Sequence, residues 1–184
     1  MCRVHDVADF FIDSALNDPE NNMTNLRINK LLYFAQGWSL ARLGRPLFED
    51  AIEAWTHGPV VPAIYQRLKT SGRDKVKGLI NEDYADHFTL EEQRLLIDVL
   101  HAYDRYSTNG LVTLTHAKGS PWRKAMAKGR NTVIPQSDMK AYFLQQGALP
   151  TFQMPQFRPS DFIGRRDEMT GNYVLPKEWD DDEP

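Results

Sequence analysis

Residues 26–43 read LRINKLLYFAQGWSLARL, and this stretch decides the fold of the chain. Its apolar side chains recur on most sides of a helix rather than along one stripe. A helix that is apolar all round is usually buried at the centre of a domain. Thr24 or Asn25 can cap its start, and Gly44 is a natural stop after its end. We therefore expect a mainly α-helical domain with this helix at its centre.

Helical patterns continue on both sides of the central segment. In residues 89–92, TLEE, the Thr89 hydroxyl can accept from the third helical amide while Glu92 reaches back, which is a capping box. Ser120-Pro121 offers an N-cap followed by proline at the first helical position. Asn109-Gly110 is expected to separate two helical segments. Together the patterns predict helices over residues 4–15, 60–68, 90–103, 111–115, 121–126 and 137–146.

A short β element is expected after the central helix. Residues 51–55, AIEAW, alternate well enough to form a short strand. Gly58-Pro59 predicts a tight turn from this strand into the following helix, because glycine accepts a positive φ. The predicted fold is mainly α: a compact helical domain with a short two- or three-stranded β element, plus an extended C-terminal arm.

The composition changes after Gly147. Residues 148–184 hold five of the eleven prolines, no helical or strand periodicity, and several large apolar residues at irregular spacing. They carry four basic and eight acidic residues, so the net charge of −3 arises here and residues 1–147 carry +1. Because ordinary disordered tails are poor in aromatics, we expect an arm that packs on a partner. The predicted domains are residues 1–147 and the extension 148–184.

Composition also limits the compartment and the partners. The single cysteine, Cys2, allows no intrachain disulfide, which suits a reducing compartment. No stretch approaches the roughly 20 apolar residues of a membrane span, and no apolar leader follows the N-terminus. A near-neutral domain argues against direct binding of nucleic acid. We expect a cytoplasmic protein that contacts neither membrane nor nucleic acid.

The common catalytic and metal-binding motifs are absent from the sequence. Neither a phosphate-binding glycine loop nor GxSxG, HExxH or CxxC occurs. His57 and His116 could converge on a ligand, which leaves open a small histidine-dependent hydrolase. Structural histidines explain both residues more simply, since no carboxylate or metal-ligand spacing accompanies them. We expect a binding protein rather than an enzyme, with no catalytic residue, cofactor or metal.

Three blocks of sequence resemble the Panacea antitoxin domain, also described as the SocA-like or GepA phage-associated family. They are residues 30–38, KLLYFAQGW; residues 46–65, which contain EAWTHGPVVP; and residues 116–122, HAKGSPW. Residues 134–143 resemble the closing helix of the family. The blocks follow in order over residues ~3–147, which is more specific than any single motif. The family-motif residues are Trp38, Trp55, Gly58, Pro59, His116, Pro121 and Trp122.

The resemblance implies a helical domain with a little sheet that belongs to a toxin–antitoxin pair. Such antitoxins neutralise their toxins by direct binding, so the expected partner is a cognate toxin encoded next to this chain. One described member instead delivers its toxin to a protease, and a proteolytic adaptor is the alternative here. A regulator of its own operon is disfavoured by the lack of a basic recognition helix.

The extension is the expected source of toxin specificity, because it goes beyond the shared domain. Its terminal run of acidic residues is either a solubilising end or a segment that Trp179 anchors on a basic surface. The Arg165-Arg166 pair is either a phosphate contact or simply solvated. The expected toxin-binding residues are Phe157, Phe162, Arg165, Tyr173, Trp179, Asp180, Asp181 and Asp182.

Overall fold

The computed structural model describes residues 2–16, 23–153, 165–166 and 173–174. Contacts divide the chain into two compact units, Met1–Phe152 and Gln153–Pro184. The first unit runs a few residues past Gly147, where the sequence placed the end of the helical domain; that boundary stays a prediction.

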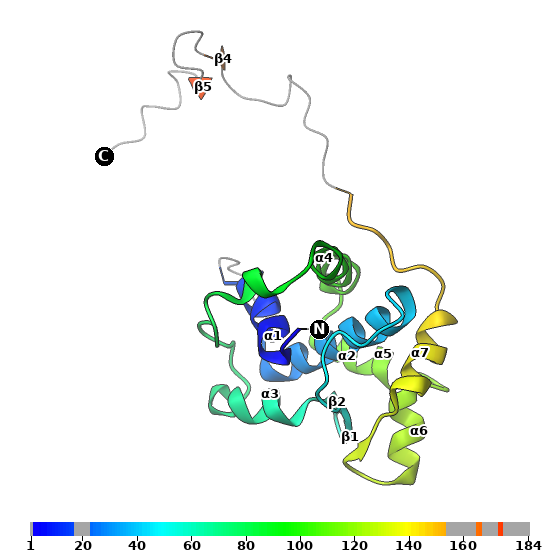
Figure 1. Cartoon of the computed structure of the whole chain (residues 1–184). Coiled ribbons are helices and arrows are strands. Elements are labelled where there is room, and N and C mark those ends of the chain that lie inside the picture. Colours follow the sequence, from blue (N-terminus) through cyan, green and yellow to red (C-terminus); the bar gives the residue numbers. More distant parts are fainter. Residues whose placement is uncertain (1, 17–22, 154–164, 167–172, 175–184) are drawn as a thin grey trace. The chain divides into compact units, whose positions relative to one another are not determined.

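The first unit is mainly helical, as predicted (Figure 1). Its α-helices are α1 (Val4–Asp13), α2 (Asn25–Arg42), α3 (Pro62–Arg67), α4 (Leu90–Asp104), α5 (Thr108–Thr115), α6 (Pro121–Lys128) and α7 (Gln136–Leu144). Two 3-10 helices, η1 (Lys69–Ser71) and η2 (Tyr84–His87), lie between α3 and α4. The strands are β1 (Glu53–Trp55), β2 (Gly58–Val60) and β3 (Thr132–Val133).

Helix α2 is the central helix, which confirms the expectation from residues 26–43 (Figure 1). It contacts α1, α3, α4, α5, α7 and β2. Thr24 caps it, since its hydroxyl accepts from the backbone N–H of Arg27 at 3.2 Å. Every residue from 27 to 40 is buried, including the polar ones. The other elements of this unit are therefore arranged around α2.

The small sheet corrects the predicted turn at Gly58-Pro59. Strand β1 pairs antiparallel with both β2 and β3, so the strand order is β2-β1-β3. Gly58 and Pro59 lie in β2, where Gly58 takes φ +107°. The turn is therefore a strand-to-strand hairpin around Thr56-His57 and not a turn into a helix. Helix α3 begins later, at Pro62.

The second correction concerns Asn109-Gly110. The capping box of α4 is present as predicted, with both the Thr89 and Glu92 hydrogen bonds formed. The next helix, however, begins at Thr108, because the Ser107 hydroxyl accepts from the backbone N–H of Gly110. Asn109 and Gly110 thus lie in the first turn of α5, where breakers of a helix interior are tolerated.

In the second unit the structure describes one short pair of strands. Strand β4 (Arg165–Arg166) pairs antiparallel with β5 (Tyr173–Val174). This pairing was not evident in the sequence, where these residues show no alternation, because two-residue strands are too short to carry a pattern.

Helices α2 and α7 approach one another closely at Gly37. A Cβ added to this residue would lie 2.2 Å from Cε2 of Phe143, on α7. The Phe143 ring has little room to move, since it packs edge-on against Tyr33, Phe34 and Trp38 of α2. Glycine is therefore required here by packing, although glycine weakens a helix interior.

We predict that Gly37→Ala lowers the free energy of unfolding by about 2 kcal/mol, as overpacking of a buried site does. Gly110→Ala is the matched control, because an added Cβ there meets nothing closer than 3.4 Å. That substitution should be neutral or stabilise α5 by up to about 1 kcal/mol. Urea unfolding followed by circular dichroism measures both; equal stability of the two variants would contradict the close approach.

Candidate functional site

Six of the seven family-motif residues gather around the β1–β2 hairpin. Together with Lys30 we call them the hairpin cluster: Lys30, Trp55, Gly58, Pro59, His116, Pro121 and Trp122. They come from α2, the hairpin, the end of α5 and the start of α6. These segments are distant in the sequence, and contacts of α2 with β2, of α5 with β2 and of α6 with β1 bring them together.

Lys30 ties the hairpin to α2. Its side chain is fully buried, and Nζ donates to the carbonyl oxygen of Pro59 at 2.8 Å. A Cβ on Gly58 would lie 2.6 Å from Cε and 3.0 Å from Nζ of Lys30. The glycine therefore leaves the space that the lysine occupies, in addition to accepting its positive φ. The sequence showed Lys30 only as one polar residue in a nearly apolar helix.

Trp122 ties the other side of the hairpin to α6. Its Nε1–H donates to the carbonyl oxygen of Trp55 at 2.9 Å. Ser120 caps α6 through the backbone N–H of Arg123, and its hydroxyl donates to the carbonyl oxygen of Thr115 at 2.8 Å. Pro121 occupies the first turn, where no amide donor is needed. The Ser120-Pro121 helix start is confirmed, and Trp122 is buried.

His57 and His116 lie in different surroundings, and no hydrogen bond joins their imidazoles among the described residues. The His116 ring stacks on Trp122, with ring centroids 3.6 Å apart and planes at 4°. Burial, and after it the charge of Lys30, lowers the pKa of His116. His116 Nε2 is buried without a hydrogen-bond partner among the described residues, whereas His57 is exposed in the hairpin turn. The stacking on Trp122 gives His116 a packing role.

Trp38, the seventh family-motif residue, lies in a separate aromatic group. Its Nε1–H donates to the hydroxyl of Tyr103 at 2.9 Å. Phe34 stacks on the Tyr103 ring at 3.9 Å between centroids. The group therefore joins α2 to α4 and borders a surface cavity that the sequence did not predict.

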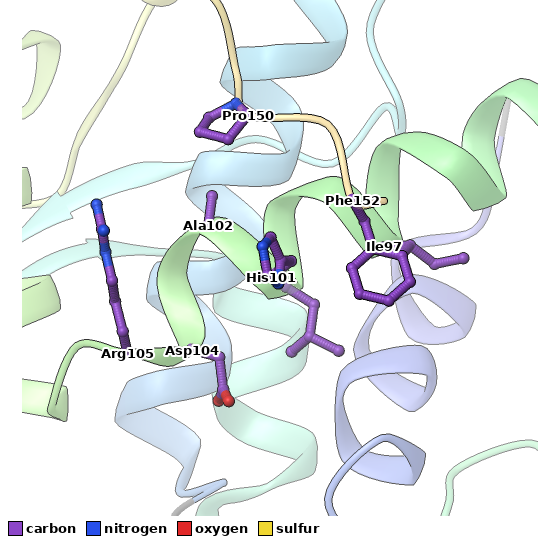
Figure 2. Close-up of a pocket in the computed structure, with 8 residues that line it drawn as sticks. Ile97, His101, Ala102, Asp104, Arg105, Pro150 and Phe152 are labelled. Atoms are coloured by element: carbon purple, nitrogen blue, oxygen red, sulfur yellow. The ribbon is translucent and has the colours of Figure 1, made fainter. Parts of the chain in front are cut away.

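Two neighbouring cavities lie beside α4, and we call them together the α4 groove. The larger has a volume of about 600 Å³ and is lined by Ile97, His101, Arg105 and Phe152, among others (Figure 2). The smaller, of about 290 Å³, is lined by fifteen residues, seven of them aromatic, and most of these aromatic residues come from α2, α4 and α7. Ala102, Arg105 and Pro150 line both. The groove is open to solvent and largely apolar, a combination suited to a partner side chain.

The segment after α7 forms one wall of this groove. The backbone N–H of Phe152 donates to Oδ1 of Asp98 at 2.8 Å, and the Phe152 ring packs edge-on against His101 at 5.2 Å (Figure 2). Asp98 also pairs with Arg42 of α2. These contacts attach the chain to α4 up to Phe152, which remains 38% exposed.

Tyr33 places an unpaired hydroxyl at the smaller cavity. The residue lines that cavity and is 1% exposed, yet its hydroxyl has no hydrogen-bond partner among the described residues. Burial raises the pKa of Tyr33 well above its usual value, so the hydroxyl is a neutral donor. A buried hydroxyl without a partner costs free energy that a bound acceptor could recover.

The toxin-binding residues expected from the sequence are only partly within the described residues. Phe157, Phe162, Trp179, Asp180, Asp181 and Asp182 lie outside them. Arg165 and Tyr173 are described as backbone alone, in β4 and β5. Their role stays a prediction.

The described residues contain neither a cluster of metal ligands nor a membrane-spanning helix. No group of three or more His, Cys, Asp or Glu side chains in residues 2–16, 23–153, 165–166 and 173–174 is placed to hold a metal ion. Among these residues, no helix combines the length and the apolar character required to cross a bilayer.

The sequence of the chain is similar to those of known proteins. A family model described as "Antitoxin SocA-like, Panacea domain" matches residues 28–123, a range that contains all seven family-motif residues. The chain is 34% identical over 143 residues to Antitoxin SocA of Caulobacter vibrioides (strain NA1000 / CB15N), covering 68% of this chain and 71% of that protein. No solved structure matches significantly.

The buried Lys30 leads to a prediction about pH. Burial lowers its pKa from 10.5 to about 7, so between these values the unfolded chain binds a proton that the folded chain does not. Stability should therefore rise with pH across pH 7–9, by up to about 1.4 kcal/mol per pH unit. Lys30→Met should remove this rise, whereas Lys124→Met, at an exposed position of α6, should keep it.

Urea unfolding at pH 7, 8 and 9 compares the three proteins. Parallel pH profiles for Lys30→Met and the unsubstituted protein would show that Lys30 is not the titrating group.

Proposed function

The chain belongs to the SocA-like, Panacea-domain family of antitoxins, and from this membership we propose that it neutralises a cognate toxin by binding that toxin directly. The observation that carries the proposal is the family match over residues 28–123 together with the 34% identity to Antitoxin SocA. Binding of this kind requires no chemistry by the antitoxin itself, which agrees with the packing role of His116.

The contacts inside the domain indicate which surface is available for a partner. In the hairpin cluster, the side-chain donors of Lys30 and Trp122 already form hydrogen bonds with the hairpin backbone. The indole N–H of Trp38 likewise donates to the hydroxyl of Tyr103. The α4 groove, by contrast, has open apolar walls and the unpaired Tyr33 hydroxyl. We therefore place toxin contact at the α4 groove and not at the hairpin cluster.

The groove has the properties of an interface anchor site. Partner side chains that enter a desolvated aromatic pocket supply most of the free energy of a typical interface. Ile97 and Phe152 remain 39% and 38% exposed at the larger cavity, so a partner could bury both. Asp104 and Arg105 add polar groups of both signs at its edge (Figure 2).

The extension supplies the second part of the proposed interface. Its residues after Phe152 include the aromatic residues and the acidic end predicted to contact toxin, among them Phe157, Trp179 and Asp180. A basic toxin surface would complement its charge of four basic against eight acidic residues over 148–184. The single cysteine suits a cytoplasmic setting for this encounter.

A proteolytic adaptor is the second candidate, because delivery of a toxin to a protease also begins with direct binding. The two mechanisms differ in stoichiometry. An inhibitor protects cells at one antitoxin per toxin without changing toxin abundance, whereas an adaptor lowers toxin abundance and requires the protease. Toxin levels measured during rescue, in cells with and without the protease, separate them.

We predict that Ile97→Glu weakens toxin binding about tenfold or more, because it introduces a charge at the apolar wall of the α4 groove. Leu90→Glu is the matched control: Leu90 lies on the same helix, is 62% exposed and does not line the groove. It should bind as the unsubstituted protein does. The measurement is calorimetric titration with the product of the adjacent reading frame, backed by growth rescue.

Equal toxin affinities of the two variants would contradict a role for the α4 groove in the interface. If the product of the adjacent reading frame does not inhibit growth, the proposal that it is the cognate toxin is contradicted.

We also predict that a chain ending at Phe152 stays folded but binds the toxin more weakly than the full chain, because the first compact unit ends there and residues 153–184 of the extension are missing. Circular dichroism confirms folding of the truncated chain, and calorimetry compares the affinities. Unchanged affinity would make residues 153–184 dispensable for recognition.

A further inference from the structure

A third cavity opens between the first turn of α2, the β1–β2 hairpin and the segment from α3 to Arg73. Its volume is about 540 Å³, within the range of small-molecule sites. It shares no lining residue with the α4 groove. The toxin-binding proposal does not involve this cavity. The residues that line the cavity provide three kinds of group.

The first is an aromatic wall. Trp55 and Tyr65 line the cavity with ring centroids 4.8 Å apart and planes at 60°. Both rings are half-buried, so part of each is open to the cavity. The Trp55 Nε1–H donates to Oε2 of Glu53 at 2.8 Å, which fixes the orientation of the indole. Such a wall offers a flat face on which a planar ring can stack.

The second is an excess of positive charge. Lys69 and Arg73 line the cavity as exposed side chains, and neither forms an ion pair with another described residue. His57 adds a further nitrogen donor or acceptor. No Asp or Glu is among the described residues that line the cavity, although acidic residues outnumber basic ones in the whole chain. Arginine and lysine at the mouth of a cavity suit a phosphate group.

The third is a set of amides that shape the floor. Asn29 Nδ2 donates to Oδ1 of Asn25 at 2.8 Å, and Asn25 Nδ2 donates to the carbonyl oxygen of Tyr65 at 3.1 Å. Asn29 Oδ1 accepts from the backbone N–H of Val61 at 2.8 Å. Because these bonds cross-link α2 to the start of α3, the floor is rigid before any ligand arrives.

Asn131 provides a side-chain amide that remains available. Its backbone N–H donates to the carbonyl oxygen of Ala54 at 2.8 Å, while its side chain has no hydrogen bond among the described residues. It is also the one described non-glycine residue with a positive φ, +59°. Such backbone conformations collect at ligand sites, although asparagine accepts this one more readily than most residues. An asparagine amide can read the polar edge of a base.

We propose that this cavity binds a nucleoside phosphate, with the base against Trp55 and Tyr65 and the phosphate at Lys69 and Arg73. Inorganic phosphate alone would leave the aromatic wall unused, and an apolar ligand would leave the cations unused. The same nucleotide chemistry could come from a free mononucleotide or from the end of an RNA strand. Residues 1–147, which contain the cavity, carry a net charge of only +1 and do not favour a polyanion, so the free nucleotide is the occupant proposed.

Calorimetric titration of the full-length protein with AMP, adenosine, inorganic phosphate and a 5′-phosphorylated RNA hexamer tests the proposal. AMP should bind saturably below about 1 mM, and adenosine and inorganic phosphate each about tenfold more weakly, since each lacks one half of the contacts. No saturable AMP binding overturns the proposal. Binding of the RNA about tenfold tighter than AMP also overturns it, in favour of an RNA end.

Two charge reversals locate the site. Arg73→Glu should weaken AMP binding about tenfold or more, because it replaces a phosphate partner with a like charge. Arg67→Glu, an exposed residue of α3 outside the cavity lining, should leave it within about twofold. Both positions are exposed, so both variants should fold. Equal effects of the two reversals would mean that AMP binds elsewhere, which overturns the assignment of this cavity.

Discussion

The structure depends on the burial of α2 on all sides, because a helix so enclosed cannot leave its polar side chains to water. An unpaired buried donor costs about 1–3 kcal/mol, and a buried charge costs more. Six buried polar side chains of α2 therefore bond the backbone of another segment, namely Asn25, Arg27, Asn29, Lys30, Gln36 and Ser39, whereas the Tyr33 hydroxyl has no partner among the described residues. Gln36 shows this most fully: its Nε2 donates to the carbonyl oxygen of Phe48, while its Oε1 accepts from the backbone N–H groups of Leu47 and Phe48.

The same rule places the other segments around α2. Arg27 donates to the carbonyl oxygens of Asp104 and Tyr106, which attaches the end of α4 and the turn after it to α2. Lys30 holds the hairpin, and Ser39 holds the carbonyl oxygen of Arg45. The polar residues that interrupt the apolar pattern of residues 26–43 are therefore the residues that order the loops. These hydrogen bonds explain why the motif residues near the hairpin form a scaffold, while toxin recognition is proposed for another surface.

Two such surfaces adjoin the scaffold and differ in chemistry. The α4 groove is apolar and aromatic, and the segment ending at Phe152 forms one of its walls. The cavity at the hairpin combines the Trp55–Tyr65 pair with cationic side chains. A protein partner at the groove and a nucleotide at the cavity could be bound independently, because the two sites share no lining residue. The hairpin cluster lies next to the cavity through Trp55, so a ligand there would contact the scaffold directly.

The sequence by itself determined the elements whose hydrogen bonds are local. The capping box at Thr89, the Ser120-Pro121 helix start and the enclosed helix over 26–43 were all predicted, because helical bonds and caps join residues three or four positions apart. The family-motif residues were also identified in the sequence, but not what they contact. Tertiary structure alone decided that Gly58-Pro59 enters a strand, since β1 pairs with β2 and also with Thr132–Val133, far away in the chain. It also decided that Lys30 bonds Pro59, and that Phe152 completes the wall of the α4 groove. Strand pairing, buried polar partners and cavities join residues that are distant in sequence, and no local periodicity encodes such contacts.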